Sequence, residues 1–260
     1  MRVLLCFLIS CFLLILPSDA AINGIVQKED EQGFAGNTVI DAQTGRPISK
    51  VLIKVPAKNI ETKTDASGRF DLKTRIDSPT IMSLQKDGYK PYSLTLSDSA
   101  LSKPLVVGIE KSTPKDVIVE TDSIHLGDDR YADTSANAFQ FSLKAVGPFY
   151  TKNFNIKPMQ GTENAYIVLG SIIGIDTEMA KQLGQSRVVT AYASPPTIFF
   201  NGNEIAEIKI NGDGQVIKIP KQIVKPGSNT LTIKAGKNMA QQTYIDYDDI
   251  EFTNLIVEVR

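Results

Sequence analysis

The chain has 260 residues, of which 42% are hydrophobic and 22% are charged, and its formal net charge at pH 7 is −1. This length and composition predict one large or two small globular domains. A nearly balanced charge without a basic tract excludes the positive surface that nucleic-acid binding requires. The only histidine, His125, excludes a multi-histidine zinc site, and the sequence has no phosphate-binding or dinucleotide-binding glycine loop.

The first twenty residues have the pattern of a secretory signal peptide. Arg2 precedes an apolar run over residues 3–16, Pro17 breaks that run, and Ser18 and Ala20 place small residues before a cut after Ala20. The run is shorter than the roughly 20 residues that span a bilayer. We therefore expect a cleaved signal over residues 1–20 with no later membrane span, and an uncleaved anchor is the alternative.

Both cysteines, Cys6 and Cys11, lie inside this signal, so the exported chain would hold no disulfide and no thiolate site. The passage Leu8-Ile9-Ser10-Cys11 has the form of a lipoprotein box. Because the apolar run continues past Cys11, the sequence argues against lipidation. We expect a periplasmic or secreted protein in which residues 21–35 form a polar, loosely ordered leader.

Short strand-like runs alternate with turn signals through residues 36–111, which is the pattern of a small β-sandwich. Gly45 and Gly68 supply backbone conformations that other residues resist, and Asp65 can bond to its own turn backbone. Ile53 and Phe70 are expected in the core. The expected strands are 38–41, 51–55, 61–64, 69–72, 81–84, 93–96 and 105–109.

This unit resembles the carboxypeptidase regulatory-like domain. The matching passages are Gly36-Asn37-Thr38-Val39-Ile40-Asp41, Thr44-Gly45-Arg46-Pro47-Ile48, Thr64-Asp65-Ala66-Ser67-Gly68-Arg69-Phe70 and Lys86-Asp87-Gly88-Tyr89. The resemblance implies a prealbumin-like Greek-key sandwich over residues 36–111 that serves as a non-catalytic module of exported proteins. Residues 112–120, stiffened by Pro114, are expected to form a linker.

Residues 121–260 are again expected to be mainly strands, with one short helix that Thr177 caps and that runs through Leu183 to Gly184. The unit resembles the galactose-binding-like jelly roll, on passages 125–129, 208–212, 225–231 and 246–252. The fold class is therefore expected to be all-β, with two tandem β-sandwich domains. The expected strands are 139–143, 165–169, 197–200, 216–219, 230–234 and 254–259.

Acidic residues gather near both ends of the second unit. Calcium prefers six to eight oxygen ligands, and in galactose-binding-like domains the first and last strands are neighbours that often share a structural Ca²⁺. The resemblance thus implies a calcium site, for which the alternative is a solvated or turn-capping acidic loop. The candidate calcium ligands are Asp128, Asp129, Asp246, Asp248, Asp249 and Glu251.

Catalysis is not expected. The acids near the chain end lie in one local loop, whereas a glycosidase places its two carboxyl groups across a cleft. His125 has no Gly-x-Ser-x-Gly elbow to serve and is expected to be a hydrogen-bonded structural residue beside a turn. We therefore expect a non-enzymatic protein.

A sugar site would combine an aromatic platform with polar hydrogen bonds. The sequence has no tryptophan, so Tyr150 and Tyr192, which are expected in loops together with Phe149, are the candidate ligand-binding residues. Phe139, Phe141 and Phe200 are expected in the core.

Together these patterns predict an exported, non-catalytic binding or adhesion module whose ligand class, a glycan, follows from the resemblance. The alternatives are a structural component of a cell-envelope complex, with an envelope protein as partner, and an accessory subunit of a secreted hydrolase. An exposed aromatic pair beside asparagine and aspartate would favour the glycan, whereas a large exposed apolar edge would favour assembly.

Overall fold

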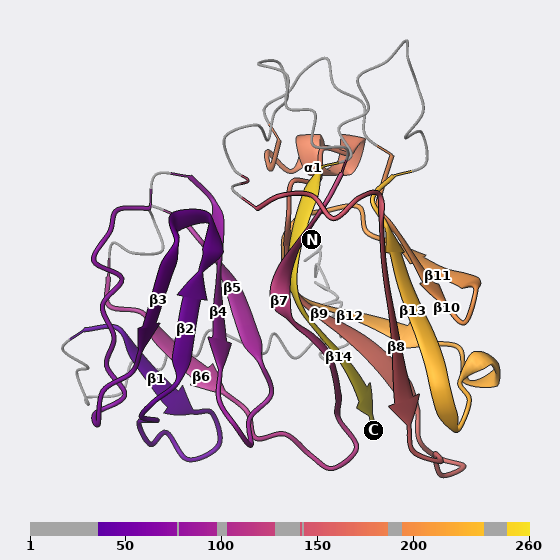
Figure 1. The fold of residues 1–260 in the computed structure, drawn as a ribbon, viewed down its shortest axis with the longest axis horizontal. Coiled ribbons are helices and arrows are strands. Elements are labelled where there is room, and N and C mark those ends of the chain that lie inside the picture. The colour runs from indigo at the N-terminus through magenta and orange to yellow at the C-terminus, as the bar shows by residue number, and fades with distance from the viewer. Residues whose placement is uncertain are drawn as a thin grey trace, which may run out of the picture.

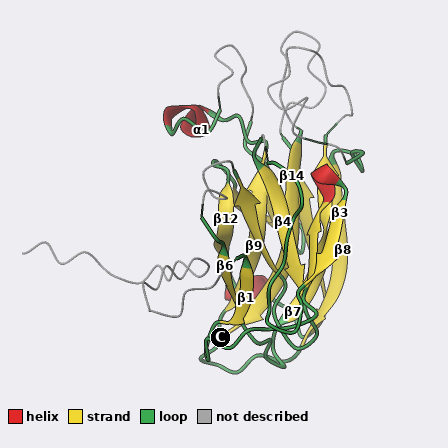
Figure 2. Ribbon diagram, turned by 90° about the vertical axis from the view of Figure 1, so that its left-hand side faces the viewer, coloured by secondary structure: helices red, strands yellow, loops and turns green. Residues whose placement is uncertain are grey.

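The computed structural model describes residues 36–76, 78–97, 103–127, 141, 143–186, 194–236 and 249–260. Nearly all of their regular structure is β-strand, which confirms the all-β prediction (Figure 2). The predicted short helix is present as α1 (Glu178–Gln182). Thr177 caps it as expected, since its Oγ1 accepts a hydrogen bond from the Ala180 amide at 3.2 Å. None of the helices in this part of the chain is long and apolar enough to cross a membrane.

The first six strands form two sheets that enclose an apolar cluster. One sheet is antiparallel with the order β3-β2-β4-β5, and the other is the parallel pair β1-β6. Side chains alternate along a strand, and Ile53 and Val55 accordingly share the buried face of β2. The elements are β1 (Thr38–Asp41), β2 (Leu52–Val55), the 3-10 turn η1 (Pro56–Lys58), β3 (Ile60–Lys63), β4 (Thr80–Gln85), β5 (Tyr92–Leu96) and β6 (Val106–Ile109).

The later strands form two antiparallel four-stranded sheets, β12-β9-β14-β7 and β11-β10-β13-β8. A second apolar cluster, which includes Phe200 and Phe252, draws on strands of both sheets. Strands β7 and β14 are neighbours, as expected of the first and last strands of this unit. The elements are β7 (Val117–Leu126), β8 (Phe149–Ile156), β9 (Ala165–Ile173), β10 (Thr197–Phe200), β11 (Asn203–Glu207), β12 (Gly212–Ile219), the 3-10 turn η2 (Lys221–Ile223), β13 (Gly227–Lys234) and β14 (Ile250–Val259).

Two expected strands differ from the structure. Residues 69–72 make only an isolated bridge between Arg69 and Thr38, because Asp71 accepts a hydrogen bond from the Lys73 amide and turns the chain. Of the run 139–143, residues 139, 140 and 142 lie outside the described residues, and the other two are not in a strand.

Strands β9, β12, β13 and β14 are longer than the expected runs. The strands β7, β8 and β11 were not expected from the sequence patterns, and β7 begins at Val117, within the segment predicted to be a linker. That segment opens with a turn in which the Thr113 amide donates to the Asp116 carboxylate at 2.6 Å. The β-branched run that follows the turn then continues as strand.

The sheet β3-β2-β4-β5 packs against the sheet β12-β9-β14-β7, as Figure 1 shows on the side where β5 faces β9 and β12. The contact combines the apolar cluster of Ile81, Phe141 and Ile173 with polar contacts. The Ser93 hydroxyl donates to the Thr253 carbonyl at 3.4 Å, and the Thr95 amide and hydroxyl donate to the Asp213 carboxylate at 2.9 and 2.8 Å. Gly170 allows this approach, since a Cβ there would lie 2.4 Å from the Ser93 Oγ.

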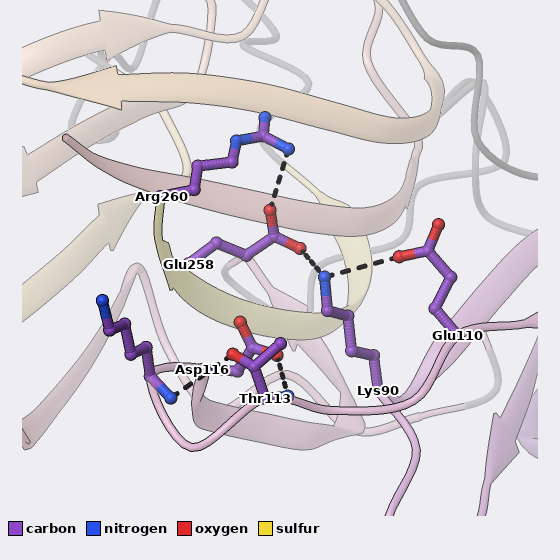
Figure 3. A network of polar contacts seen from close by, with 7 residues as sticks. Lys90, Glu110, Thr113, Asp116, Glu258 and Arg260 are labelled. Carbon is purple, nitrogen blue, oxygen red and sulfur yellow. Dashed lines mark hydrogen bonds and ion pairs between the residues drawn. The ribbon is translucent and has the colours of Figure 1, made fainter. Parts of the chain in front are cut away.

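A charged network closes one end of the same interface (Figure 3). The Lys90 Nζ lies 2.6 Å from one carboxylate oxygen of Glu258 and 3.4 Å from Glu110, while Arg260 lies 3.2 Å from the other oxygen of Glu258. Burial lowers the pKa of Lys90, but the hydrogen bond to Glu258 and the surrounding acids outweigh it and leave that pKa raised. Lys90 therefore stays charged and ties β14 to the loop between β4 and β5.

Candidate functional site

The structure describes two of the six predicted calcium ligands, Asp249 and Glu251. Asp249 and Glu251 stand at the start of β14, where Glu251 pairs with His125 of β7 and both residues are buried. A Cβ on Gly127 would lie 1.9 Å from the Asp249 carboxylate, so only glycine fits beside that acid. The other four candidates, Asp128, Asp129, Asp246 and Asp248, lie outside the described residues.

His125 is held from both ring nitrogens. Its Nδ1 donates to the Leu143 carbonyl at 2.6 Å, its Nε2 lies 3.1 Å from the Asp249 Oδ1, and its ring stacks on Phe141 with centroids 4.8 Å apart. Burial lowers the pKa of His125, but the hydrogen bonds to Asp249 and Leu143 outweigh that effect and raise it. With Nδ1 donating to a carbonyl, only the protonated ring can also donate to Asp249, so this geometry favours the cation.

Glu251 lies beside this pair on β14. Glu251 is 1% exposed, and neither of its carboxylate oxygens has a hydrogen-bond partner among the described residues. Burial raises the pKa of Glu251 to about 7, against the opposing charge of His125. The carboxyl of Glu251 is thus buried beside the ion pair of His125 and Asp249.

These two acids do not assemble a calcium site with their described neighbours. Among the described residues no group of three or more potential metal ligands converges. Asp249 directs one oxygen at the N–H of His125, whereas calcium requires several converging oxygens. A calcium site here would need ligands from outside the described part of the chain.

The sequence predicted Tyr150 in a loop. In the structure it lies in β8, with its ring facing inward. It is 8% exposed, its hydroxyl donates to the Glu120 Oε2 at 2.8 Å, and its ring meets Phe252 edge-on at 5.4 Å. Burial, together with the Glu120 carboxylate, raises the pKa of Tyr150. Tyr150 is therefore a core residue with a satisfied hydroxyl, and Tyr192 lies outside the described residues.

We expect Tyr150→Phe to lower the free energy of unfolding by about 1 kcal/mol, because it removes one part-buried hydrogen bond to a carboxylate. Denaturant unfolding of the two proteins at pH 7 measures the change. Tyr166→Phe is the matched control, since the Tyr166 hydroxyl has no hydrogen-bond partner in the described part of the chain. An unchanged midpoint for Tyr150→Phe would contradict the structural role.

The outward side of the sheet β11-β10-β13-β8 carries the exposed ring of Phe149, the partly buried ring of Phe199 and exposed amide groups. Along β8 and β13 the alternate side chains Tyr150 and Leu231 point into the core, so the intervening ones point outward. Phe199, between the core residues Ile198 and Phe200, faces the same way from β10. We call this surface the polar face. It consists of Phe149, Thr151, Asn153, Asn155, Phe199, Ser228, Thr230, Thr232 and Lys234.

The polar face is organised in cross-strand rows. Lys234 pairs with Phe149 and places its Nζ 5.8 Å from the ring centroid, while the hydroxyls of Thr151 and Thr232 lie 3.0 Å apart. In the next row the Thr230 hydroxyl donates to the Asn153 Oδ1 at 2.6 Å. Figure 1 shows β8, β10 and β13 on the side of the molecule away from β1–β6.

Several groups of this face keep unused hydrogen-bonding capacity. Phe149 is 53% exposed, and Asn153 and Asn155 are exposed. A hydroxyl has one donor and two acceptor positions and an amide has two donors, so the pairing within each row leaves donors and acceptors for a ligand. The sequence does contain this signal, as alternating polar residues at 151, 153 and 155 and at 228, 230 and 232.

Comparison with known proteins adds little. No family model matches the chain, and no curated protein matches it in sequence. Among solved structures, the wild-type glycoside hydrolase BuGH86 in complex with neoagarooctaose aligns with 87% of this chain and 28% of its own, at 11% identity and a TM-score of 0.30.

Two further solved structures match to a similar degree. A variant of BuGH86, also in complex with neoagarooctaose, aligns with 55% of this chain and 18% of its own, at 13% identity and a TM-score of 0.31. A ruminal GH26 endo-β-1,4-mannanase aligns with 46% of this chain and 20% of its own, at 15% identity and a TM-score of 0.24. The chain spans less than a third of the length of these proteins, and similarity this weak carries no argument about its function.

Proposed function

We propose that the protein is an exported, non-catalytic glycan-binding module whose binding site is the polar face. The proposal includes two β-sandwich domains, residues 36–111 and 121–260, of which the second presents the ligand surface. The observation that carries it is the exposed ring of Phe149 beside Asn153, Asn155 and the threonine pairs. A sugar ring offers apolar C–H groups for such a ring and hydroxyls for amides and hydroxyls.

The buried cluster of His125, Asp249 and Glu251 supports the non-catalytic part of the proposal. His125 is 0% exposed, so the one histidine of the chain cannot exchange a proton with a ligand at the surface. The residues that define the polar face include no histidine, and the nearest carboxyl groups, Glu204 and Glu207, lie on the edge strand β11. The side chains of the polar face are suited to binding and orienting a ligand.

A glycan-array screen of the purified protein, followed by titration calorimetry on the best ligand, tests the proposal. We expect Phe149→Ala to weaken binding about fivefold, because one aromatic stacking contact is worth about 1 kcal/mol. Val216→Ala is the matched control, since Val216 is also exposed, at 51%, but belongs to β12 in another sheet.

Each measurement is made in calcium and again in chelator, so that a calcium requirement is detected separately. Binding that the Phe149 substitution leaves unchanged would place the site elsewhere on the molecule. Silence on the array, from protein shown to be folded by circular dichroism, would reject the glycan function. The structural role in an envelope complex would then be the better proposal.

A further inference from the structure

Phe149 and Phe199 are the two aromatic residues of the polar face, and their places are fixed by strand register. Phe149 on β8 pairs with Lys234 on β13, and Lys234 in turn pairs with Thr197 on β10. Phe199 follows Thr197 by two residues and therefore faces the same side, in the row of Thr232 and Thr151. The two phenylalanines thus lie two strands and one row apart.

This register sets the distance between the two positions. Neighbouring strands lie about 4.8 Å apart and two residues along a strand rise about 6.8 Å, so the two Cα atoms are separated by roughly 12 Å. That separation exceeds the width of one sugar ring. A single terminal sugar could therefore contact one phenylalanine, but it could not contact both.

The strand between the two rings, β13, presents Lys234 and Thr232 there. Lys234 stands beside Phe149, whereas Glu204 and Glu207 of the edge strand β11 pair with Phe199 and Thr197. The Lys209 Nζ lies 3.6 Å from the Glu207 carboxylate, so two positive and two negative side chains leave this part of the face with no net charge. Its electrostatics therefore match an uncharged polyol better than a polyanionic chain.

We infer that the polar face binds an extended, uncharged oligosaccharide chain, with different sugar units stacked on Phe149 and Phe199. This inference rests on the proposed function and adds to it a minimum ligand length and a ligand charge. The chain crosses β13 between the two rings, where the Thr232 hydroxyl and the Lys234 ammonium group bond to its intermediate unit. A monosaccharide uses one of the two aromatic positions and so gains only part of the contact.

The test uses unbranched β-1,4-linked oligosaccharides of glucose, mannose and xylose, from one to six units long, titrated calorimetrically into the purified protein. We expect the affinity for one of these series to rise at least tenfold between one and four units and then to level off. Phe199→Leu keeps an apolar side chain but removes the flat ring, and it is expected to remove about fivefold of that gain. Val216→Ala should reproduce the unmodified protein, and thermal unfolding confirms that each variant is folded.

The outcomes separate this inference from the proposed function. A monosaccharide that binds as tightly as the longest chain, or a length dependence that Phe199→Leu leaves intact, overturns the inference while glycan binding stands. Preference for oligogalacturonate over every uncharged chain overturns the assignment of ligand charge. Failure of every oligosaccharide tested, charged and uncharged, overturns both the inference and the proposed function.

Discussion

Replacing Glu251 with glutamine is expected to raise the free energy of unfolding at pH 8 by about 3 kcal/mol and to change it little at pH 4. The carboxyl is 1% exposed and has no hydrogen-bond partner among the described residues, and burial raises its pKa from 4.5 to about 7. A group whose pKa is higher in the folded state stabilises that state most below its unfolded pKa. This contribution is lost as the pH rises from 4.5 through about 7.

Denaturant unfolding across this pH range measures the effect. His125 contributes with the same sign, because its folded pKa is also raised, so Glu251→Gln should flatten most of the decline and not all of it. Glu61→Gln on the exposed edge strand β3 is the matched control and should leave the pH profile unchanged. A variant less stable than the unmodified protein at pH 8 would show that the Glu251 carboxylate has a partner outside the described residues.

Adding one methyl group at Gly170 is expected to disturb the packing of the sheet β3-β2-β4-β5 on the sheet β12-β9-β14-β7. A Cβ there would lie 2.4 Å from the Ser93 Oγ, 2.8 Å from the Thr253 carbonyl oxygen and 2.8 Å from the Asn254 Cβ. Because two of these neighbours belong to β14 itself, a side-chain rotation of Ser93 cannot relieve the clash. Overpacking of this kind costs about 1–3 kcal/mol, which is the loss in unfolding free energy that we expect for Gly170→Ala.

Gly212→Ala provides the control in the same sheet, since a Cβ on Gly212 would meet nothing closer than the Gln215 Nε2 at 3.7 Å. Hydrogen exchange adds a local measurement to the unfolding curves. Gly170→Ala should accelerate exchange in β4 and β5, which face β9, more than in β10 and β13 on the far sheet. Equal acceleration in all four strands would mean that the strain is not confined to this interface.

The sequence predicted those strands that have strong alternation and β-branched residues, such as β2, β9 and β13. It missed β8 because Phe149-Tyr150-Thr151-Lys152-Asn153 mixes aromatic and polar residues on both faces and does not read as a half-buried strand. The sequence also predicted a strand at residues 69–72 that the structure lacks, because Asp71 forms a side-chain hydrogen bond that favours a turn over a sheet. Both errors come from local patterns that tertiary contacts override.

The candidate site was harder to predict than the fold. Tyr150 was chosen as a tyrosine in an expected loop, but the β8–β13 register turns its ring toward Phe252 and exposes Phe149 instead. Whether a residue faces the core or solvent depends on strand register, and a one-residue error reverses the answer. The residues of the polar face share one side of the sheet only because of the register between β8, β13 and β10, which the sequence does not specify.

The position of β14 between β7 and β9 also determines when this protein can fold. A chain synthesised from its N-terminus presents β7 and β9 long before residues 250–259 follow, so until then β7 has no strand partner in this sheet and β9 has only β12. The side of β4 and β5 that packs on this sheet also cannot be fully covered before β14 is in place. During synthesis β7 and one edge of β9 thus stay unpaired until residues 250–259 are made, and in that interval aggregation competes with folding.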